Sequence, residues 1–87
     1  MCRSITTLRG LDPAATDEEV EDAALQYVRK VSGIRAPSGA TQQAFDDAVR
    51  QVAAATAGLL SALPARKVPP PTVPPRRRLA AAGRPVR

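Results

Sequence analysis

Cys2 is the residue of this sequence whose chemistry is most suggestive, because it is the only cysteine and follows the initiator methionine. Removal of Met1 would place the Cys2 thiol beside an α-amine with a pKa of about 8, which can act as the base for its own nucleophile. Arg3 would help to hold the thiolate. Such enzymes also need an oxyanion hole and a substrate cleft, for which an 87-residue chain has little room. We therefore expect Cys2 to be a small apolar side chain beside Ile5, and an N-terminal-cysteine nucleophile or redox protein is the least favoured of three hypotheses.

The residue counts exclude several other kinds of chemistry. Without histidine the chain has no imidazole for acid–base catalysis or metal ligation, and one cysteine cannot close a disulfide within the chain. The acidic cluster between Asp17 and Asp22 lies at the start of an expected helix, where the helix dipole favours negative charge. No Gly-rich phosphate-binding loop occurs. We therefore expect a protein that is not an enzyme and that has no metal, cofactor or small-molecule substrate.

Charge divides sharply along the chain. Residues 1–63 carry six basic and eight acidic side chains, a net charge of −2, whereas residues 64–87 carry seven basic side chains and no acid. Seven of the nine prolines lie in the same C-terminal segment, so two composition shifts coincide at Pro64. We predict a helical domain over 1–63 and a disordered basic, proline-rich tail over 64–87. The candidate polyanion-binding residues are the cations of the tail: Arg66, Lys67, Arg76, Arg77, Arg78, Arg84 and Arg87.

The tail combines a polyproline segment with an arginine triplet, in the run KVPPPTVPPRRR. Proline holds a chain extended, and arginine offers planar donors to phosphate. The tail has no aromatic side chain for base stacking, so contact would be with the phosphate backbone. Our first hypothesis is a binding protein whose tail contacts RNA, DNA or a ribonucleoprotein. Two other interpretations stay open: Pro71 to Arg76 has the spacing of a polyproline ligand, and a GC-rich coding sequence alone would produce such a tail.

A second basic patch is predicted at one end of the helical domain. Its candidate members are Arg29, Lys30 and Arg35, together with Arg3 and Arg9. Gathered there, they would form an anion site suited to phosphate. The alternative is a solvated helix end, because helix C-termini attract cations in any case.

These residues must be positioned by a few helices, and the first is marked at both ends. Thr16 and Glu19 have the spacing of a capping box, and Gly33 suits the left-handed position just past a helix end. Between them the apolar residues recur at helical spacing. The sequence therefore predicts a helix over 17–31, with an apolar stripe of Val20, Ala23, Ala24, Tyr27, Val28 and Val31.

A longer helix is predicted over 41–63. Ser38 and Thr41 are both candidate N-caps, and Pro64 disfavours helix in the residue before it. The small side chains of residues 53–58 would let a neighbouring helix come close, although they also reflect the helix propensity of alanine. Its apolar face is expected to comprise Phe45, Ala48, Val49, Val52, Ala55, Leu59, Leu60 and Leu63, with Thr56 as the one polar member.

The N-terminal segment carries Ile5, Leu8 and Leu11 at spacing three, which suits one or two helical turns, although Thr6 and Thr7 would also suit an extended chain. A two-helix hairpin of about 45 residues buries too little surface to be stable alone. We therefore expect the N-terminal segment to pack across the hairpin or, failing that, two chains to pair into a four-helix bundle. Our second hypothesis is accordingly a homodimeric protein–protein interaction module with an incidental tail.

The opening MCRSITTLRGLDPAAT, the helix EEVEDAALQYVRKVSG and the later APSGATQQAFDDAVRQVAAATAGLLSAL carry a resemblance to one family. The sequence resembles small bacterial proteins grouped as domain of unknown function 2277. The Met-Cys-Arg start and LQYVRKVSG are its most specific parts, and the resemblance covers residues 1 to about 63, leaving the tail outside. It implies a compact helical bacterial protein and supplies no activity or site residues. No secretory or membrane segment is recognised, since Val52 to Leu63 is about half the ~20 residues that a spanning helix needs, so the expected location is the cytoplasm.

Overall fold

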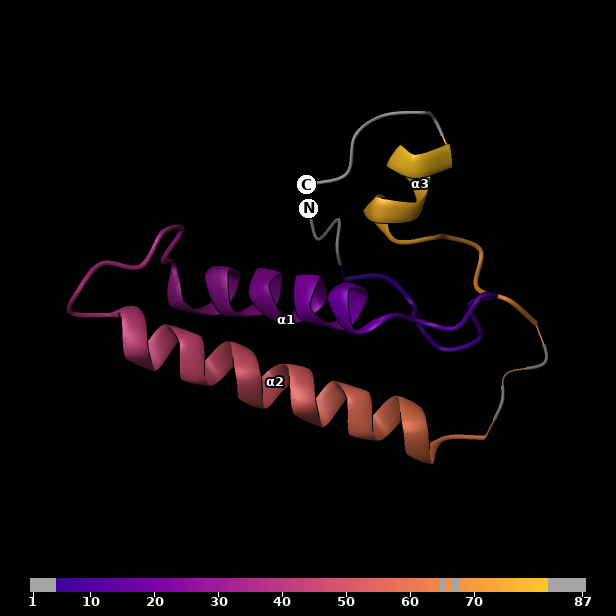
Figure 1. Cartoon of the computed structure of the whole chain (residues 1–87), viewed down its shortest axis with the longest axis horizontal. Helices are drawn as coiled ribbons and strands as arrows, with labels where there is room; N and C mark the ends of the chain where they lie inside the picture. Colours follow the sequence, from indigo (N-terminus) through magenta and orange to yellow (C-terminus); the bar gives the residue numbers. More distant parts are fainter. Residues whose placement is uncertain (1–4, 65, 67, 82–87) are drawn as a thin grey trace.

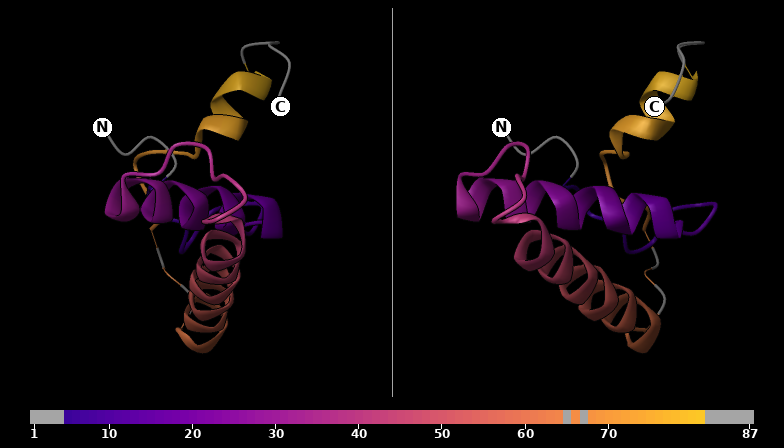
Figure 2. Two further views of the ribbon diagram at one scale, coloured as in Figure 1. Left: turned by 90° about the vertical axis from the view of Figure 1, so that its left-hand side faces the viewer. Right: turned by 60° about the vertical axis from the view of Figure 1, so that its left-hand side comes forward.

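The computed structural model describes residues 5–64, 66 and 68–81. This part of the chain contains three helices and no strand: α1 (Asp17–Ser32), α2 (Gln42–Ala62) and α3 (Pro75–Ala81). α1 and α2 lie side by side as an antiparallel hairpin, and α3 lies on the opposite side of α1 from α2 (Figure 1, Figure 2). The predicted all-α hairpin is confirmed, with both main helices within one residue of their predicted bounds at each end.

The ends of α1 are set by the signals in the sequence. Thr16 Oγ1 accepts a hydrogen bond from the backbone N–H of Glu19 at 3.2 Å, and the Thr16 N–H donates to Glu19 Oε1 at 2.9 Å. At the other end, Gly33 has a φ of 73° and donates its N–H to the carbonyl of Arg29 at 2.9 Å. A residue without Cβ adopts this left-handed conformation readily. The predicted capping box and glycine C-cap are both confirmed.

The start of α2 differs from the prediction. Thr41 is the N-cap by position, but its φ of −113° and ψ of −10° are helical, and its side chain makes no capping bond. Its hydroxyl instead accepts from the N–H of Ser38 at 2.9 Å, so neither candidate residue caps the helix with its side chain. A capping side chain usually requires extended backbone, which Thr41 lacks. The other end follows the prediction: Leu63 is extended, as expected before Pro64.

The N-terminal segment packs across the hairpin, as predicted. Residues 5–16 form turns and irregular chain rather than a helix. Leu8 and Leu11 are buried together with Val20 of α1, against half-buried Ala53 and Leu60 of α2. The peptide bond between Asp12 and Pro13, inside this segment, is cis. The core of the described residues is small, and its buried apolar side chains are Leu8, Leu11, Val20, Ala24, Val28 and Phe45.

The apolar face predicted for α2 is only partly covered. Of the residues in this 21-residue helix, only Phe45 is buried. Four of the predicted face residues and Thr56 are half-buried, whereas Ala55, Leu59 and Leu63 are exposed. Leu59 is 56 % exposed although it lies within the helix. One side of the hairpin therefore presents apolar surface that the described part of the chain leaves open. The half-buried apolar members are Ala48, Val49, Val52 and Leu60.

The tail is not disordered over its described length, which corrects the prediction for that stretch. Just after α2, the guanidinium of Arg9 donates two hydrogen bonds to the carbonyl of Pro64, at 3.0 and 2.8 Å. Arg66 lies against Gly10, where an added Cβ would come within 2.9 Å of Arg66 Cβ. Further along, Pro70 and Pro74 are buried. The tail thus folds back over the N-terminal segment before it reaches α3.

Charge is the physical reason that the described part of the tail is folded against the rest of the chain. The tail has no acid of its own, so its arginines can form ion pairs only with carboxylates elsewhere, and the first turns of α1 supply them. None of the helices in the described ranges has the length and apolarity needed to cross a bilayer.

Candidate functional site

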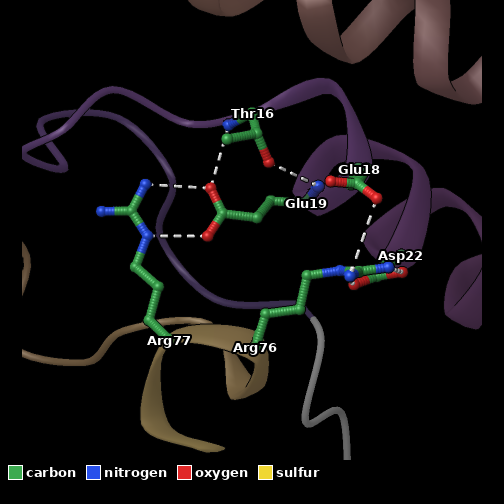
Figure 3. Close-up of polar contacts among 6 residues, drawn as sticks. All are labelled: Thr16, Glu18, Glu19, Asp22, Arg76 and Arg77. Atoms are coloured by element: carbon green, nitrogen blue, oxygen red, sulfur yellow. Dashed lines mark hydrogen bonds and ion pairs between the residues drawn. The ribbon is translucent and has the colours of Figure 1, made fainter. Parts of the chain in front are cut away.

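Two arginines of α3 meet three carboxylates of α1 in one cluster, which we call the arginine–carboxylate cluster (Glu18, Glu19, Asp22, Arg76 and Arg77; Figure 3). Its centre is a two-pronged contact. Arg77 Nε donates to Glu19 Oε2 at 2.7 Å, and Arg77 Nη2 donates to Glu19 Oε1 at 3.0 Å. The planar guanidinium matches a carboxylate in this geometry, which makes such pairs stronger than single hydrogen bonds.

The Glu19 carboxylate takes part in two contacts, the capping box of α1 and the ion pair with α3. Its Oε1 also accepts the N–H of Thr16 in the capping box, so helix initiation and α3 docking share one carboxylate. The side chain is only 3 % exposed, and it is the one buried charged residue among those the structure describes. The hydrogen bond from Arg77 lowers the pKa of Glu19 and outweighs burial, which acts in the opposite direction. Glu19 is therefore held as a carboxylate and is a poor proton acceptor.

Arg77 is held from two sides. Besides Glu19, it donates through Nη2 to the carbonyl of Ala14 at 3.1 Å, in the segment that leads into α1. The hydrogen bond to Glu19 raises the pKa of Arg77, so this cation keeps its charge. A fixed charge on each partner makes the contact a structural clamp rather than a proton-transfer pair.

Arg76 makes the outer half of the cluster. Its Nε donates to Asp22 Oδ2 at 2.6 Å and its Nη2 donates to Asp22 Oδ1 at 3.4 Å, while Nη1 lies 3.8 Å from Glu18 Oε2. The hydrogen bond to Asp22 raises the pKa of Arg76. Asp22 is 34 % exposed and Glu18 is 74 % exposed, so water and salt screen this half more than the Glu19 half.

The other predicted tail cations are placed differently. Arg66 and Arg78 are exposed, and Arg78 Nη1 donates only to the carbonyl of Val73, at 3.3 Å. Three further candidates lie outside the described residues: Lys67, Arg84 and Arg87. The predicted tail site is therefore divided between two arginines held by α1 and at least two that face solvent.

Of the predicted second basic patch, Arg29, Lys30 and Arg35 lie at one end of the hairpin, and Arg9 lies away from them. Arg29 and Lys30 are exposed in the last turn of α1 and Arg35 is exposed in the loop after it, whereas Arg9 bonds to Pro64 at the opposite end of the hairpin (Figure 1). The antiparallel arrangement separates them, because the loop after α1 and the chain after α2 lie at different ends. Arg3 and Cys2 lie outside the described residues.

An apolar groove lies between the two main helices and under the N-terminal segment. It has a volume of about 270 Å³ and is lined by three residues each from α1, α2 and the segment before α1. Tyr27 and Ile5, two of its lining residues, are 48 % and 42 % exposed. One polar atom, Thr6 Oγ1, is buried without a hydrogen-bond partner among the described residues. The groove adjoins the uncovered side of α2. The residues of α2 that line the groove are Val52, Thr56 and Leu60, all of them half-buried.

The described residues contain no cluster of three or more His, Cys, Asp or Glu side chains suited to hold a metal ion. The chemistry of the two regions is that of binding surfaces, since guanidinium groups suit anions and the groove lining suits apolar side chains. The sequence named Arg76 and Arg77 as anion-binding candidates, but their pairing with α1 and the groove were not predicted. The acidic start of the first helix and the acid-free arginine tail did give a signal that these two segments would attract each other.

The fold and these contacts define the class of protein. Over its described residues it is a small all-α protein with a helical hairpin, and its C-terminal helix α3 carries arginines and folds back onto α1. A family model described as "Uncharacterized conserved protein (DUF2277)" matches residues 1–84, and the chain belongs to that family. The match confirms the resemblance seen in the sequence and corrects its extent, because most of the tail lies inside the matched range. No curated protein and no solved structure matches the chain.

Proposed function

We propose that the protein is a non-enzymatic interaction module that pairs with a second copy through the open side of its hairpin. The observation that supports this most directly is the incomplete cover of α2, where only Phe45 is buried out of 21 residues. Burial of apolar surface is the main favourable term in association. The exposed Leu59 and the adjoining groove are where that surface would be buried.

A second copy is the occupant that the charges of α2 favour. Residues 51–65 carry no charged side chain. In a two-fold symmetric dimer each surface patch meets its own copy, so any charge near the axis would face a like charge. The uncharged C-terminal half of α2 avoids that repulsion. Two hairpins joined in this way form a four-helix bundle, whose core would include the side chains that one hairpin leaves open.

Sedimentation velocity of the full chain over a wide range of protein concentration tests this proposal. We expect a dimer at the upper end of the range, and Leu59→Glu is expected to shift the protein to monomer while its helical circular dichroism is unchanged. Ala54→Glu is the matched control, since it adds the same charge to an exposed position of α2 more than a third of a turn from Leu59. A wild-type protein that stays monomeric throughout would contradict the proposal.

We propose phosphate contact by the tail as a second candidate function, and the exposure of Arg66 and Arg78 supports it. Two exposed cations on an acid-free segment attract a phosphate backbone without reading its sequence. A mobility shift with single-stranded RNA at two salt concentrations checks this, using the full chain. Replacing Arg66 and Arg78 together by Gln is expected to weaken binding, whereas replacing Arg29 and Lys30 by Gln removes the same charge elsewhere and is expected to matter less. Equal loss in the two double variants would contradict a specific role for the tail.

The hypothesis of an N-terminal-cysteine enzyme is separated from both proposals by one measurement. Intact-mass analysis of the purified protein shows whether Met1 is retained. A retained Met1 removes that hypothesis, because the Cys2 thiol then has no neighbouring free amine.

A further inference from the structure

The arginine–carboxylate cluster has the chemistry of an occupied anion site. The Arg77 guanidinium binds a carboxylate through two parallel hydrogen bonds, at 2.7 and 3.0 Å, and a phosphate group offers a pair of oxygens with matching geometry (Figure 3). Arg76 presents a second fork to Asp22 one residue earlier. We infer that Arg76 and Arg77 form a binding site for a chain of phosphates, and that in this structure the carboxylates of α1 occupy that site. This inference rests on the second function proposed above.

α3 is held in place mainly by the groups that such a ligand would take. Among the described residues, the hydrogen bonds that tie α3 to α1 and its leading segment all come from Arg76 and Arg77. A helix of seven residues has little stability of its own, since isolated helices shorter than about 12–15 residues are marginal in water. A phosphate chain that captured both arginines would therefore release α3 from α1.

The competition selects for a polyanion over a single anion. Groups joined through a chain segment meet at an effective concentration in the millimolar range, so the internal carboxylates have a built-in advantage over a free anion. A chain of phosphates overcomes this advantage because several of its charges act together. Arg78 provides a first point of contact, since it is exposed while α3 is docked and its guanidinium bonds only to the carbonyl of Val73.

Removing an internal competitor is expected to strengthen phosphate binding. Asp22→Asn weakens the exposed half of the cluster, and Glu19→Gln weakens the buried half while keeping a side chain that fits a capping box. We expect the affinity for phosphate chains to rise about threefold for Asp22→Asn and about tenfold for Glu19→Gln, by the usual size of exposed and buried charged contacts. Glu21→Gln is the matched control: Glu21 is exposed on the same helix, and its replacement changes net charge equally.

The experiment measures fluorescence anisotropy of labelled oligouridylate, with inorganic polyphosphate and inorganic monophosphate as competitors at equal ionic strength. Amide hydrogen exchange across residues 76–81 follows α3 in parallel. The inference expects higher affinity in Asp22→Asn and Glu19→Gln but not in Glu21→Gln, and faster exchange in α3 when polyphosphate, but not monophosphate, is added. The oligouridylate and polyphosphate arms show whether a nucleic acid or a bare phosphate chain is preferred.

Each other result has a distinct meaning. If all three variants gain equally, only net charge matters, which overturns the inference and leaves phosphate contact standing. If phosphate chains bind while exchange in α3 stays slow, the site lies elsewhere and the inference is overturned. If the wild type and every variant fail to bind, phosphate contact and the inference fall together. Asp22→Asn keeps the test decisive if Glu19→Gln does not fold.

Discussion

Glu19 is the residue on which the most structure depends, because its carboxylate closes the capping box of α1 and receives Arg77. Glu19→Ala removes both contacts and leaves the Arg77 guanidinium with only the carbonyl of Ala14. We expect it to lower the free energy of unfolding by about 3 kcal/mol, given about 1 kcal/mol for a helix cap and about 1.5–3 kcal/mol for a hydrogen bond to a charged group. Urea unfolding followed by circular dichroism measures this. Glu19→Gln is expected to lose less stability, because a glutamine side chain still fits the capping box. Equal losses of stability in the two variants would show that the retained side chain contributes nothing.

The same carboxylate gives stability a pH dependence. The hydrogen bond from Arg77 holds the pKa of Glu19 below its ordinary value of 4.5 in the folded protein. A group with a lowered folded-state pKa contributes fully above its unfolded-state pKa and loses that contribution as the pH falls through the folded-state pKa. We therefore expect stability to decrease on acidification below about pH 4.5. Unfolding at a series of pH values checks this, with a shallower decrease expected for Glu19→Gln and the wild-type profile expected for Glu21→Gln.

Thr6 is a residue where the fold leaves a polar atom unsatisfied. Its Oγ1 is buried and has no hydrogen-bond partner among the described residues. An unpaired buried polar group costs about 1–3 kcal/mol, and valine has nearly the same shape without the hydroxyl. Thr6→Val is expected to raise the free energy of unfolding by about 1 kcal/mol, measured in urea. The exposed Thr7→Val serves as the control, and a destabilised Thr6→Val would show that the hydroxyl has a partner.

At the scale of the elements, the turn at Gly10 is where the N-terminal segment contacts the tail, at Arg66. Gly10 has a φ of 91°, and a Cβ there would lie 2.9 Å from Arg66 Cβ, so a side chain would meet both backbone strain and a collision. Gly33 has a positive φ but open space around it, and Gly39 has neither problem. We expect Gly39→Ala to change stability by less than about 0.5 kcal/mol, Gly33→Ala to cost about 1 kcal/mol and Gly10→Ala to cost more. Thermal unfolding of the three variants gives the order, and Gly10→Ala no worse than Gly33→Ala would argue against the contact with Arg66.

The elements that could be predicted from sequence are those whose ends are fixed by near neighbours. The capping box of Thr16 and Glu19 and the glycine at 33 act within a few residues, so the bounds of α1 followed from local chemistry. α3 did not, because proline and arginine in its sequence suggest extended, solvated chain. Its order depends on partners more than fifty positions away, and periodicity carries no information about such pairs. Likewise, the apolar spacing of α2 was predicted, but Ala55, Leu59 and Leu63 of that face are exposed, because how much of it is covered depends on packing.

At the scale of the whole molecule, the tail stabilises the helical hairpin by pairing with its buried carboxylate. The sequence indicated an independent acidic domain with a detached cation-rich segment, whereas the buried Glu19 would be left without its main partner if α3 were absent. Burying a carboxylate without a partner is unfavourable, so the hairpin and α3 should unfold as coupled parts.

Truncation measures this coupling directly. A chain ending at residue 74 lacks α3, whereas a chain ending at residue 81 keeps it and loses only the last six residues. Loss of about 1.5 kcal/mol or more from the Arg77 contact corresponds to a fall in Tm of about 6 °C or more in a domain of this size. We expect that fall for the chain ending at 74 and a wild-type Tm for the chain ending at 81, by circular dichroism. If Glu19→Gln in the shorter chain restores part of the lost Tm, the loss of stability comes from the unpaired carboxylate. Equal Tm values for the two truncated chains would mean that the hairpin is stable without α3 and that α3 adds nothing to the stability of the hairpin.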